Sequence, residues 1–269
     1  MPPEGKITAA ALRARKGTGE RIAVLTAYDV VFAGLADRAG IDAVLVGDSL
    51  GMVVQGERST LSVTLDEMVY HTRIAARGVT RAHLIADLPF MSYQASIEDG
   101  MRAAGRLMKE GNAEAVKLEG GESVAELCRR LVQAGIPVMG HVGLTPQSIH
   151  QLGGFKVQGR TDAQRTQILA DARALADAGA YAIVLEAVPH ALAAEITRAV
   201  PAVTIGIGAG VDCDGQVMVM HDLLGLQPSW KPRFVRRYAE MGKAVGEAFA
   251  AYAADVRAGT FPAAEETYD

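Results

Sequence analysis

The stretch Asp29–Ser49, DVVFAGLADRAGIDAVLVGDS, decides the fold because it contains one complete structural unit. Apolar residues at helical spacing predict a helix over Asp29–Ala39, and Gly40 stands where helices commonly end. The continuous apolar run Ala43–Gly47 then predicts a strand covered by helices. Asp48 follows directly. The unit is therefore a helix, a glycine turn, a buried strand and a carboxylate at the end of that strand.

The same order recurs along the chain, and the short turns KEGNA, QAGIP and DAGAY mark it. Apolar runs predict strands at Arg21–Thr26, Ala43–Gly47, Leu84–Asp87, Ala115–Glu119, Pro137–His141, Ala182–Glu186, Val203–Ile207 and, more weakly, Gln216–Met220. Helical spacing predicts helices at Asp29–Ala39, Leu65–Gly78, Ser96–Gly111, Ser123–Gly135, Asp162–Gly179 and Val188–Val200. Strands that alternate with helices in this way predict an α/β fold, a (β/α)8 TIM barrel.

The main alternative to this barrel is an open, doubly wound sheet. Its dinucleotide-binding form loses support, because no G-x-G-x-x-G motif follows the first predicted strand. The tail, from about Phe234 to Ala258, predicts one or two helices that close the barrel or pack on a neighbour. Since no linker separates domains, we expect a single (β/α)8 barrel domain over residues 1–269, with extra N-terminal and C-terminal helices.

Charge and cysteine content exclude several classes of partner. The net charge of −4 offers no electrostatic attraction to nucleic acid or to an anionic membrane surface. The two cysteines, Cys128 and Cys213, suit a reducing cytosol better than a disulfide framework. The N-terminus lacks the apolar core of a secretory signal, and no window has the roughly 18 apolar residues of a membrane span. We therefore expect a cytoplasmic protein that binds neither nucleic acid nor membrane.

Polar side chains gather at the ends of the predicted strands, which form the mouth of a barrel where catalytic groups cluster. They are Asp48, Ser49, Asp87, Lys117, Glu119, His141 and Glu186. Carboxylates from four strands in one cavity would repel one another, and a divalent cation resolves that conflict. Oxygen ligands without a cysteine or a histidine pair favour Mg²⁺. Three acids on the metal, directly or through water, would leave the fourth free.

Each of these residues also has a purely structural interpretation. A lone Asp48 or Asp87 is equally well explained as the N-cap of the next helix. Lys117 and Glu119 point to the same side of a strand and could form only a salt bridge. His141 alone is more often a hydrogen-bonded core histidine than a catalyst. Acids at the ends of four strands, however, are poorly explained as independent caps, so the set together predicts a metal-dependent enzyme.

Several long phrases in the chain are specific, among them LVGDSLGM at Leu45–Met52, ADLPFMSY at Ala86–Tyr93 and HVGLTPQS at His141–Ser148. Through these phrases the chain resembles the ketopantoate hydroxymethyltransferases, and the resemblance runs in order from about Ile7 to Pro262. It implies a barrel of the phosphoenolpyruvate/pyruvate type. It also implies transfer of a hydroxymethyl group from 5,10-methylenetetrahydrofolate to 3-methyl-2-oxobutanoate, giving 2-dehydropantoate and tetrahydrofolate, the first step of pantothenate biosynthesis. The implied cofactor is Mg²⁺, and the implied assembly is a homo-decamer built as a pentamer of dimers.

The resemblance also implies roles for individual residues. The metal-associated acids of the family fall on Asp48, Asp87 and Glu119. The contacts to the keto acid fall on Asp48, Ser49, Asp87 and Lys117, and the proton acceptor falls on Glu186. His141 lies in a family motif and is a possible additional site residue. In this hypothesis Mg²⁺ stabilises an enolate while Glu186 takes the C3 proton.

Two other functions are compatible with such a barrel. The first is a Mg²⁺-dependent C–C or P–C lyase or mutase of the same barrel superfamily. Those enzymes typically carry a cysteine on a lid after a middle strand, whereas Cys128 falls within a predicted helix and Cys213 after the seventh strand. The second is a non-catalytic barrel that binds a keto acid or folate. Such a module has no need of an unliganded base, Glu186, beside the metal acids.

Overall fold

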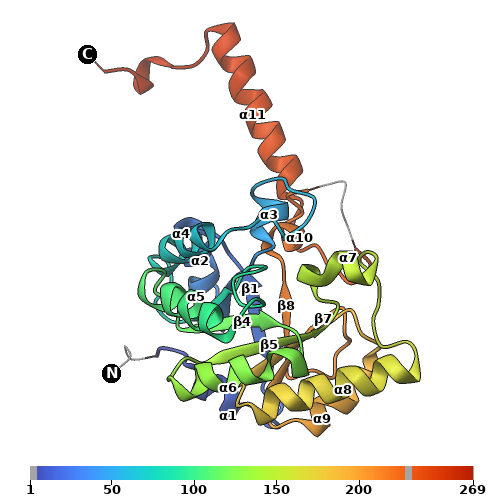
Figure 1. Cartoon of the computed structure of the whole chain (residues 1–269). Helices are drawn as coiled ribbons and strands as arrows, with labels where there is room; N and C mark the ends of the chain where they lie inside the picture. Colours follow the sequence, from blue (N-terminus) through green and yellow to red (C-terminus); the bar gives the residue numbers. More distant parts are fainter. Residues whose placement is uncertain (1–4, 228–231, 269) are drawn as a thin grey trace. The chain divides into compact units, whose positions relative to one another are not determined.

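Eight parallel strands close into a barrel in chain order, with β8 paired to β1 (Figure 1). In this computed structural model the described residues are 5–227 and 232–268. The strands are β1 (Ile22–Thr26), β2 (Ala43–Val46), β3 (His83–Asp87), β4 (Ala115–Glu119), β5 (Val138–Gly143), β6 (Ala182–Glu186), β7 (Val203–Ile207) and β8 (Gly215–Met218). The predicted strands are therefore confirmed to within about two residues at each end.

Six longer helices pack side by side, in chain order, around the strands (Figure 1). They are α2 (Val30–Arg38), α4 (Leu65–Ala76), α5 (Ile97–Lys109), α6 (Ala125–Gln133), α8 (Asp162–Asp177) and α9 (His190–Ala199). Four of them, α2, α4, α5 and α8, begin at a capping side chain; for example, Asp29 accepts hydrogen bonds from the backbone amides of Val31 and Phe32, and Thr64 forms a capping box with Glu67. The predicted barrel is confirmed.

The connection between β7 and β8 departs from the expected alternation, because residues 208–214 contain no helix. Instead this loop lies along β7, where the amide and hydroxyl of Thr204 donate to Asp214 Oδ2 at 2.7 and 3.0 Å. Gly208 and Gly210 have φ angles of 62° and 88°, which a glycine adopts without strain. The turn between these two strands is therefore made by glycines, not by a helix.

The interior of the barrel is filled by side chains that alternate along each strand. Val24, Ile85 and Met139 belong to one buried cluster that also contains Ile7 and Leu12 from the N-terminal segment. Leu12 lies on α1 (Ala9–Ala14), the predicted extra N-terminal helix. Because the amide of Ile7 donates to Arg81 O, just before β3, this segment closes the amino-terminal end of the barrel, here called the floor.

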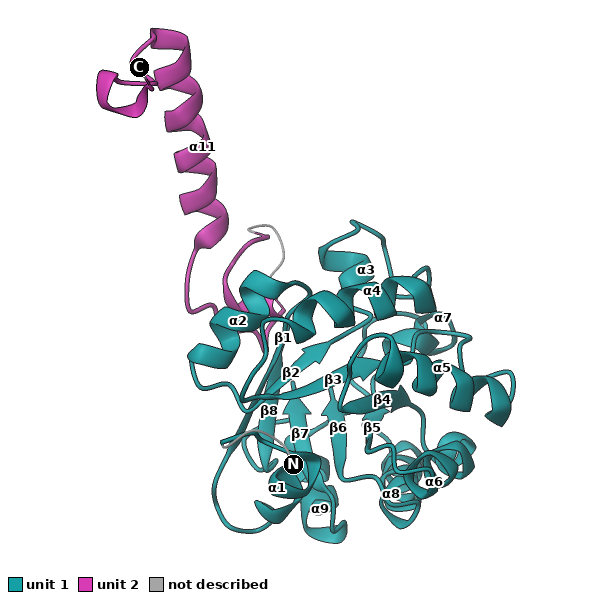
Figure 2. Cartoon of the chain, turned by 90° about the vertical axis from the view of Figure 1, so that its left-hand side faces the viewer, with its two compact units in different colours: residues 1–219 teal, residues 220–269 magenta. Residues whose placement is uncertain are grey.

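The chain divides into two compact units, Met1–Val219 and Met220–Asp269 (Figure 2). The second unit contains α10 (Met220–Leu223), α11 (Met241–Ala258) and the short helix η3 (Ala264–Glu266), so the expected C-terminal helices are confirmed. The single domain expected over 1–269 stays a prediction. Within the described residues, no helix is both long and apolar enough to cross a bilayer.

Candidate active site

Strand register brings the predicted polar residues together inside the mouth of the barrel. Asp87 lies two residues after the buried Ile85, so it faces the same interior. The register pairs Asp87 with Lys117 and Glu119 with His141 on neighbouring strands. Glu186 ends β6, two residues after a member of the interior cluster. The alternation that fills the core therefore also points these side chains inward.

Asp48 reaches the same place from the turn after β2. Its backbone amide donates to Asp87 Oδ2 at 3.0 Å, and both aspartates are almost fully buried. A side chain on Gly47 would come within 2.8 Å of Ser49 Oγ and 3.4 Å of Asp87 Oδ2. The glycine in VGDS therefore leaves room for the chain to pass close to Asp87.

Lys117 supplies a positive charge among these acids. Its Nζ lies 3.2 Å from Asp87 Oδ1 and 3.7 Å from Glu119 Oε1. Burial opposes a charge on this lysine, but the carboxylates of Asp87, Glu119 and Asp48 together raise its pKa above the ordinary value. Lys117 is therefore an ammonium ion held by at least two acids.

His141 joins the acid cluster to Glu186. Its Nδ1 lies 3.3 Å from Glu119 Oε1, and its Nε2 lies 3.3 Å from Glu186 Oε2. Burial and the nearby Lys117 lower the pKa of His141, but the contacts with Glu119 and Glu186 outweigh them and raise it to about 9. Its Nδ1 also lies 3.3 Å from Lys117 Nζ, so the ring links Lys117 and Glu119 on one side to Glu186 on the other.

The acids of the cluster differ in how well their charge is compensated. Burial raises the pKa of Asp48 well above its ordinary value, and the charges of Asp87 and Glu119 add to this. Burial also raises the pKa of Asp87, although Lys117 and the Asp48 amide oppose it. For Glu119, burial is outweighed by His141, Lys117 and the Gln147 amide, so its pKa is lowered. The two aspartates therefore lack sufficient positive charge around them.

The donor set fits a magnesium ion. Four carboxylates stand against Lys117 and at most one further cation, His141, which leaves at least two negative charges when all the acids are ionised. Asp87 Oδ1 is buried, and the contact recorded for it among the described residues is the ion pair with Lys117 Nζ at 3.2 Å. Among the described residues, no three His, Cys, Asp or Glu side chains already lie close enough together to bind one metal ion directly. Mg²⁺ suits this arrangement, because it usually takes few protein carboxylates and completes its shell with water and substrate oxygens.

Three uncharged residues at the site were missed by the sequence criterion of polar strand ends. Gln147 is only 5% exposed and contacts both Asp48 and Glu119. The hydroxyl of Tyr93 accepts from the Glu119 amide at 3.0 Å, and the hydroxyl of Tyr28 lies 2.9 Å from Ser49 Oγ. They were missed because they lie in the segments between strands and helices and not at strand ends. Gln147 and Tyr93 do fall within the motifs HVGLTPQS and ADLPFMSY, so their place in these motifs is the sequence feature that could have identified them as site residues.

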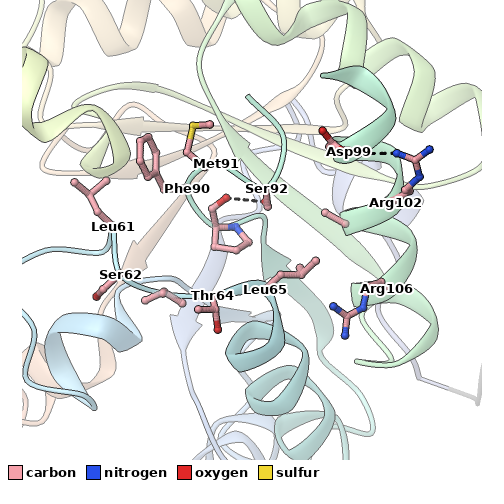
Figure 3. A pocket seen from close by; sticks show the side chains of 13 residues that line it. Leu61, Ser62, Thr64, Leu65, Phe90, Met91, Ser92, Asp99, Arg102 and Arg106 are labelled. Carbon is pink, nitrogen blue, oxygen red and sulfur yellow. Dashed lines mark hydrogen bonds and ion pairs between the residues drawn. The ribbon is translucent and has the colours of Figure 1, made fainter. Parts of the chain in front are cut away.

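A groove of about 500 Å³ lies beside the segment that follows β3, and its lining includes Pro89, two residues after Asp87 (Figure 3). One wall is Pro89–Ser92, which includes the exposed Phe90 and Met91, and a second wall is Leu61–Leu65. Its arginines are already paired, since Arg102 lies 3.3 Å from Asp99 and Arg106 contacts Asp66 and Glu110. No predicted site residue lines this groove, so it is distinct from the acid cluster.

The cysteines take no part in the cluster. Cys128 lies in α6 and Cys213 in the β7–β8 loop, and both are free and buried. Burial raises the pKa of the Cys128 thiol to about 12, which makes it a poor nucleophile. Neither cysteine therefore occupies the lid position that is typical of the lyase or mutase alternative.

Solved structures of similar fold have distant sequences. Phosphonopyruvate hydrolase in complex with oxalate and Mg²⁺ matches with a TM-score of 0.62 and 15% identity, over 96% of this chain and 92% of that one. The 2,3-dimethylmalate lyase of the PEP mutase/isocitrate lyase superfamily matches with a TM-score of 0.62 and 19% identity, over 97% and 91%. These similarities establish the barrel type and no shared reaction.

Sequence relatives are much closer. The 3-methyl-2-oxobutanoate hydroxymethyltransferase of Syntrophotalea carbinolica is 57% identical over 94% of this chain and 95% of its own length. That of Moorella thermoacetica is 55% identical over the whole of both chains. A sequence profile described as Ketopantoate hydroxymethyltransferase matches residues 6–264. The chain therefore belongs to the ketopantoate hydroxymethyltransferase family.

Proposed function

We propose that this chain transfers a hydroxymethyl group from 5,10-methylenetetrahydrofolate to 3-methyl-2-oxobutanoate, giving 2-dehydropantoate and tetrahydrofolate. This is the first step of pantothenate biosynthesis. Relatives more than half identical carry the corresponding name. The observation that carries the proposal is the buried cluster in which Asp48, Asp87 and Glu119 lie together while Glu186 stands apart, joined to it through His141.

The keto acid is bound by Asp48, Ser49, Asp87 and Lys117. The ammonium of Lys117 neutralises negative charge on the substrate carboxylate and on the enolate that forms from it. Ser49 orients the substrate, and the contact between its Oγ and the Tyr28 hydroxyl holds its side chain in place. Burial of this cluster strengthens each of these electrostatic contacts, because little water screens them.

Glu186 takes the proton from C3 of the keto acid. Its side chain is 16% exposed, against 3% for Asp87 and Glu119, so it is the acid of the set most accessible from the mouth. His141 lies 3.3 Å from its Oε2 and steadies the carboxylate. A base held at the edge of the cluster can reach the carbon while the buried acids remain occupied.

Asp48, Asp87 and Glu119 would hold Mg²⁺, directly or through water. Bound there, the ion supplies Lewis-acid stabilisation of the enolate. The charge imbalance among the buried acids supports this assignment. A barrel of the same type, phosphonopyruvate hydrolase, has been solved with oxalate and Mg²⁺.

The working form is a cytoplasmic homo-oligomer, for which the family resemblance implies a decamer built as a pentamer of dimers. Helix α11 supports association, because it has no buried residue and exposes Phe249 and Tyr252. Free, buried cysteines suit the reducing cytoplasm. Sedimentation of the purified protein tests the assembly, and a monomer at micromolar concentration would contradict it.

The decisive experiment for the function is an assay with both substrates. The purified chain, with Mg²⁺, should release tetrahydrofolate only when 3-methyl-2-oxobutanoate is present, and a chelator should stop the reaction. Cleavage of a substituted malate or a phosphonopyruvate in place of transfer would favour the lyase or mutase alternative. Binding of both substrates by calorimetry without any product would favour a non-catalytic barrel.

A further inference from the structure

Gln147 stands in η2 (Pro146–Ser148), the short turn that follows β5. Although it lies in a loop, its side chain is buried among charged groups and is only 5% exposed. A buried amide is tolerated only when its hydrogen-bonding atoms find partners, since each unsatisfied group loses the hydrogen bond that water would supply. The partners of Gln147 therefore show what the residue is held there to do.

The side chain of Gln147 uses its full hydrogen-bonding capacity. Its Nε2 donates to Asp48 Oδ2 at 2.8 Å and to the carbonyl of Leu88 at 2.9 Å. Its Oε1 accepts from the Tyr93 hydroxyl at 2.8 Å and from Gln94 Nε2 at 2.9 Å. Only this orientation of the amide gives the carboxylate a donor, so the network fixes the side chain in one position.

The main chain of the same residue contacts a second acid. The Gln147 amide donates to Glu119 Oε2 at 2.9 Å. One residue therefore binds one oxygen of Asp48 through its side chain and one oxygen of Glu119 through its backbone. One oxygen of Asp87 is also held by a backbone amide, because its Oδ2 accepts a hydrogen bond from the Asp48 amide.

A common pattern emerges for the three acids assigned to the metal. In each, an uncharged N–H group holds one carboxylate oxygen: Oδ2 of Asp48, Oδ2 of Asp87 and Oε2 of Glu119. In Asp87 and Glu119 the second oxygen is left for charged partners. Asp87 Oδ1 faces Lys117, and Glu119 Oε1 faces Lys117 and His141. Two of the three fixed oxygens depend on Gln147.

We propose that Gln147 is a positioning residue that turns Asp48 and Glu119 so that one defined oxygen of each faces the metal and the keto acid. The inference rests on the proposed function. It predicts that the Gln147 side chain acts mainly through Asp48, because the backbone contact to Glu119 survives a change of side chain. Partners that orient metal ligands typically contribute a factor of about 10–100 to metal affinity or activity.

The test is Gln147→Met, which keeps the length of the side chain but removes both the donor and the acceptor. Mg²⁺ binding is measured by titration calorimetry, without substrates. Exchange of the C3 proton of 3-methyl-2-oxobutanoate in D₂O is measured without folate. We expect Mg²⁺ binding to weaken about 10–100-fold and exchange to fall with it. Gln94→Ala is the matched control, because the exposed Gln94 gives up only its part-buried bond to Gln147 Oε1 while the donor to Asp48 stays, and it should behave as the parent.

A purely structural role predicts a different result. Gln147→Met would then lose thermal stability while Mg²⁺ affinity and the rate of exchange stay at the parent's values, and this outcome overturns the inference. If Gln147→Met does not fold, Tyr93→Phe replaces it, because this change removes the hydroxyl at Gln147 Oε1. Tyr93→Phe should weaken Mg²⁺ binding in the same direction, and parent-like binding would overturn the inference. A parent that binds Mg²⁺ but transfers no hydroxymethyl group contradicts the proposed function only.

Discussion

The two ends of the barrel each bury a histidine beside a glutamate, yet the charges around the two pairs are balanced differently. At the mouth, His141 Nδ1 lies 3.3 Å from Glu119, and at the floor His83 Nδ1 lies 3.4 Å from Glu114. Both glutamates have a lowered pKa, in which burial is outweighed by partners that favour the charge. The difference lies in what surrounds each pair.

At the floor, the negative charge of Glu114 is balanced by neighbouring residues of the chain. Glu114 pairs with Lys6 at 2.9 Å and accepts a hydrogen bond from the Leu84 amide at 2.9 Å, so one acid meets one lysine and a backbone donor. The mouth instead gathers Asp48, Asp87 and Glu186 around the same kind of pair. Excess charge at the carboxyl ends of the strands is typical of catalysis, whereas polar groups at the other end usually serve stability.

The largest expected effect comes from removing the proton acceptor. Glu186→Gln keeps the shape of the side chain but not its basicity, so kcat should fall by about 10²–10⁴-fold. Exchange of the C3 proton in D₂O should stop while calorimetry still detects binding of the keto acid. Unchanged exchange would rule out Glu186 as the base.

The corresponding change at the floor provides the control. Glu114→Gln should leave kcat and the exchange reaction unchanged. It weakens the ion pair with Lys6, so the free energy of unfolding should fall by about 1 kcal/mol. A loss of activity comparable to that of Glu186→Gln, in folded protein, would remove the functional distinction between the two ends.

Asp87→Ala should have the next largest effect. It removes the carboxylate that holds both the Asp48 amide and Lys117, so kcat/KM should fall by about 10²–10³-fold. The Mg²⁺ concentration for half-maximal activity should rise at the same time. The measurement is a metal titration of the initial rate, and parent-like values would mean that the metal assignment is wrong.

Asp37 offers a pH-dependent test at the floor. It accepts hydrogen bonds from the amides of Thr80, Arg81 and Ala82 just before β3. Burial opposes this charge, but those bonds lower the pKa of Asp37 below its ordinary value. The stability that they contribute is therefore present above the unfolded pKa of about 3.9 and is lost as the pH falls through the lower folded value.

Asp37→Asn should consequently lower the free energy of unfolding at pH 7 by about 1–3 kcal/mol. The difference from the parent should shrink as the pH falls below 4. Urea unfolding at several pH values measures both effects. A difference that stays constant down to pH 2 would mean that the charge of Asp37 contributes nothing, and catalytic rates at pH 7 should be unaffected.

The smallest expected effect is a difference in stability between changes at two buried tyrosines, Tyr181 at the floor and Tyr93 at the mouth. Tyr181 packs edge-to-face on His83, and its hydroxyl has no hydrogen-bond partner among the described residues. Tyr181→Phe should therefore be neutral or stabilise the fold by up to about 1 kcal/mol. Tyr93→Phe is the corresponding change at the mouth. It removes the hydrogen bonds of the hydroxyl with Gln147 Oε1 and the Glu119 amide, so it should lower the free energy of unfolding. Chemical denaturation measures both, and a strongly destabilised Tyr181→Phe would contradict this account of the floor.

Much of the candidate site could be predicted from local pattern because strand ends are visible in the sequence. Asp87, Glu119 and Glu186 close apolar runs, and parallel strands bring such ends to one edge. Their pairings and distances could not be predicted this way. The contact between Glu119 and His141 depends on register, which is set by packing across the whole barrel.

The strands, the helix caps and the identity of the strand-end acids follow from residues close together in the chain, since periodicity and capping are short-range effects. Tertiary structure alone decided three other features. It left β7 and β8 without a helix between them, it closed the floor with Ile7 and Leu12, and it placed Gln147 against an aspartate 99 residues away. The physical reason is that a buried polar atom must find its partner wherever the fold brings one, and sequence spacing does not encode that distance.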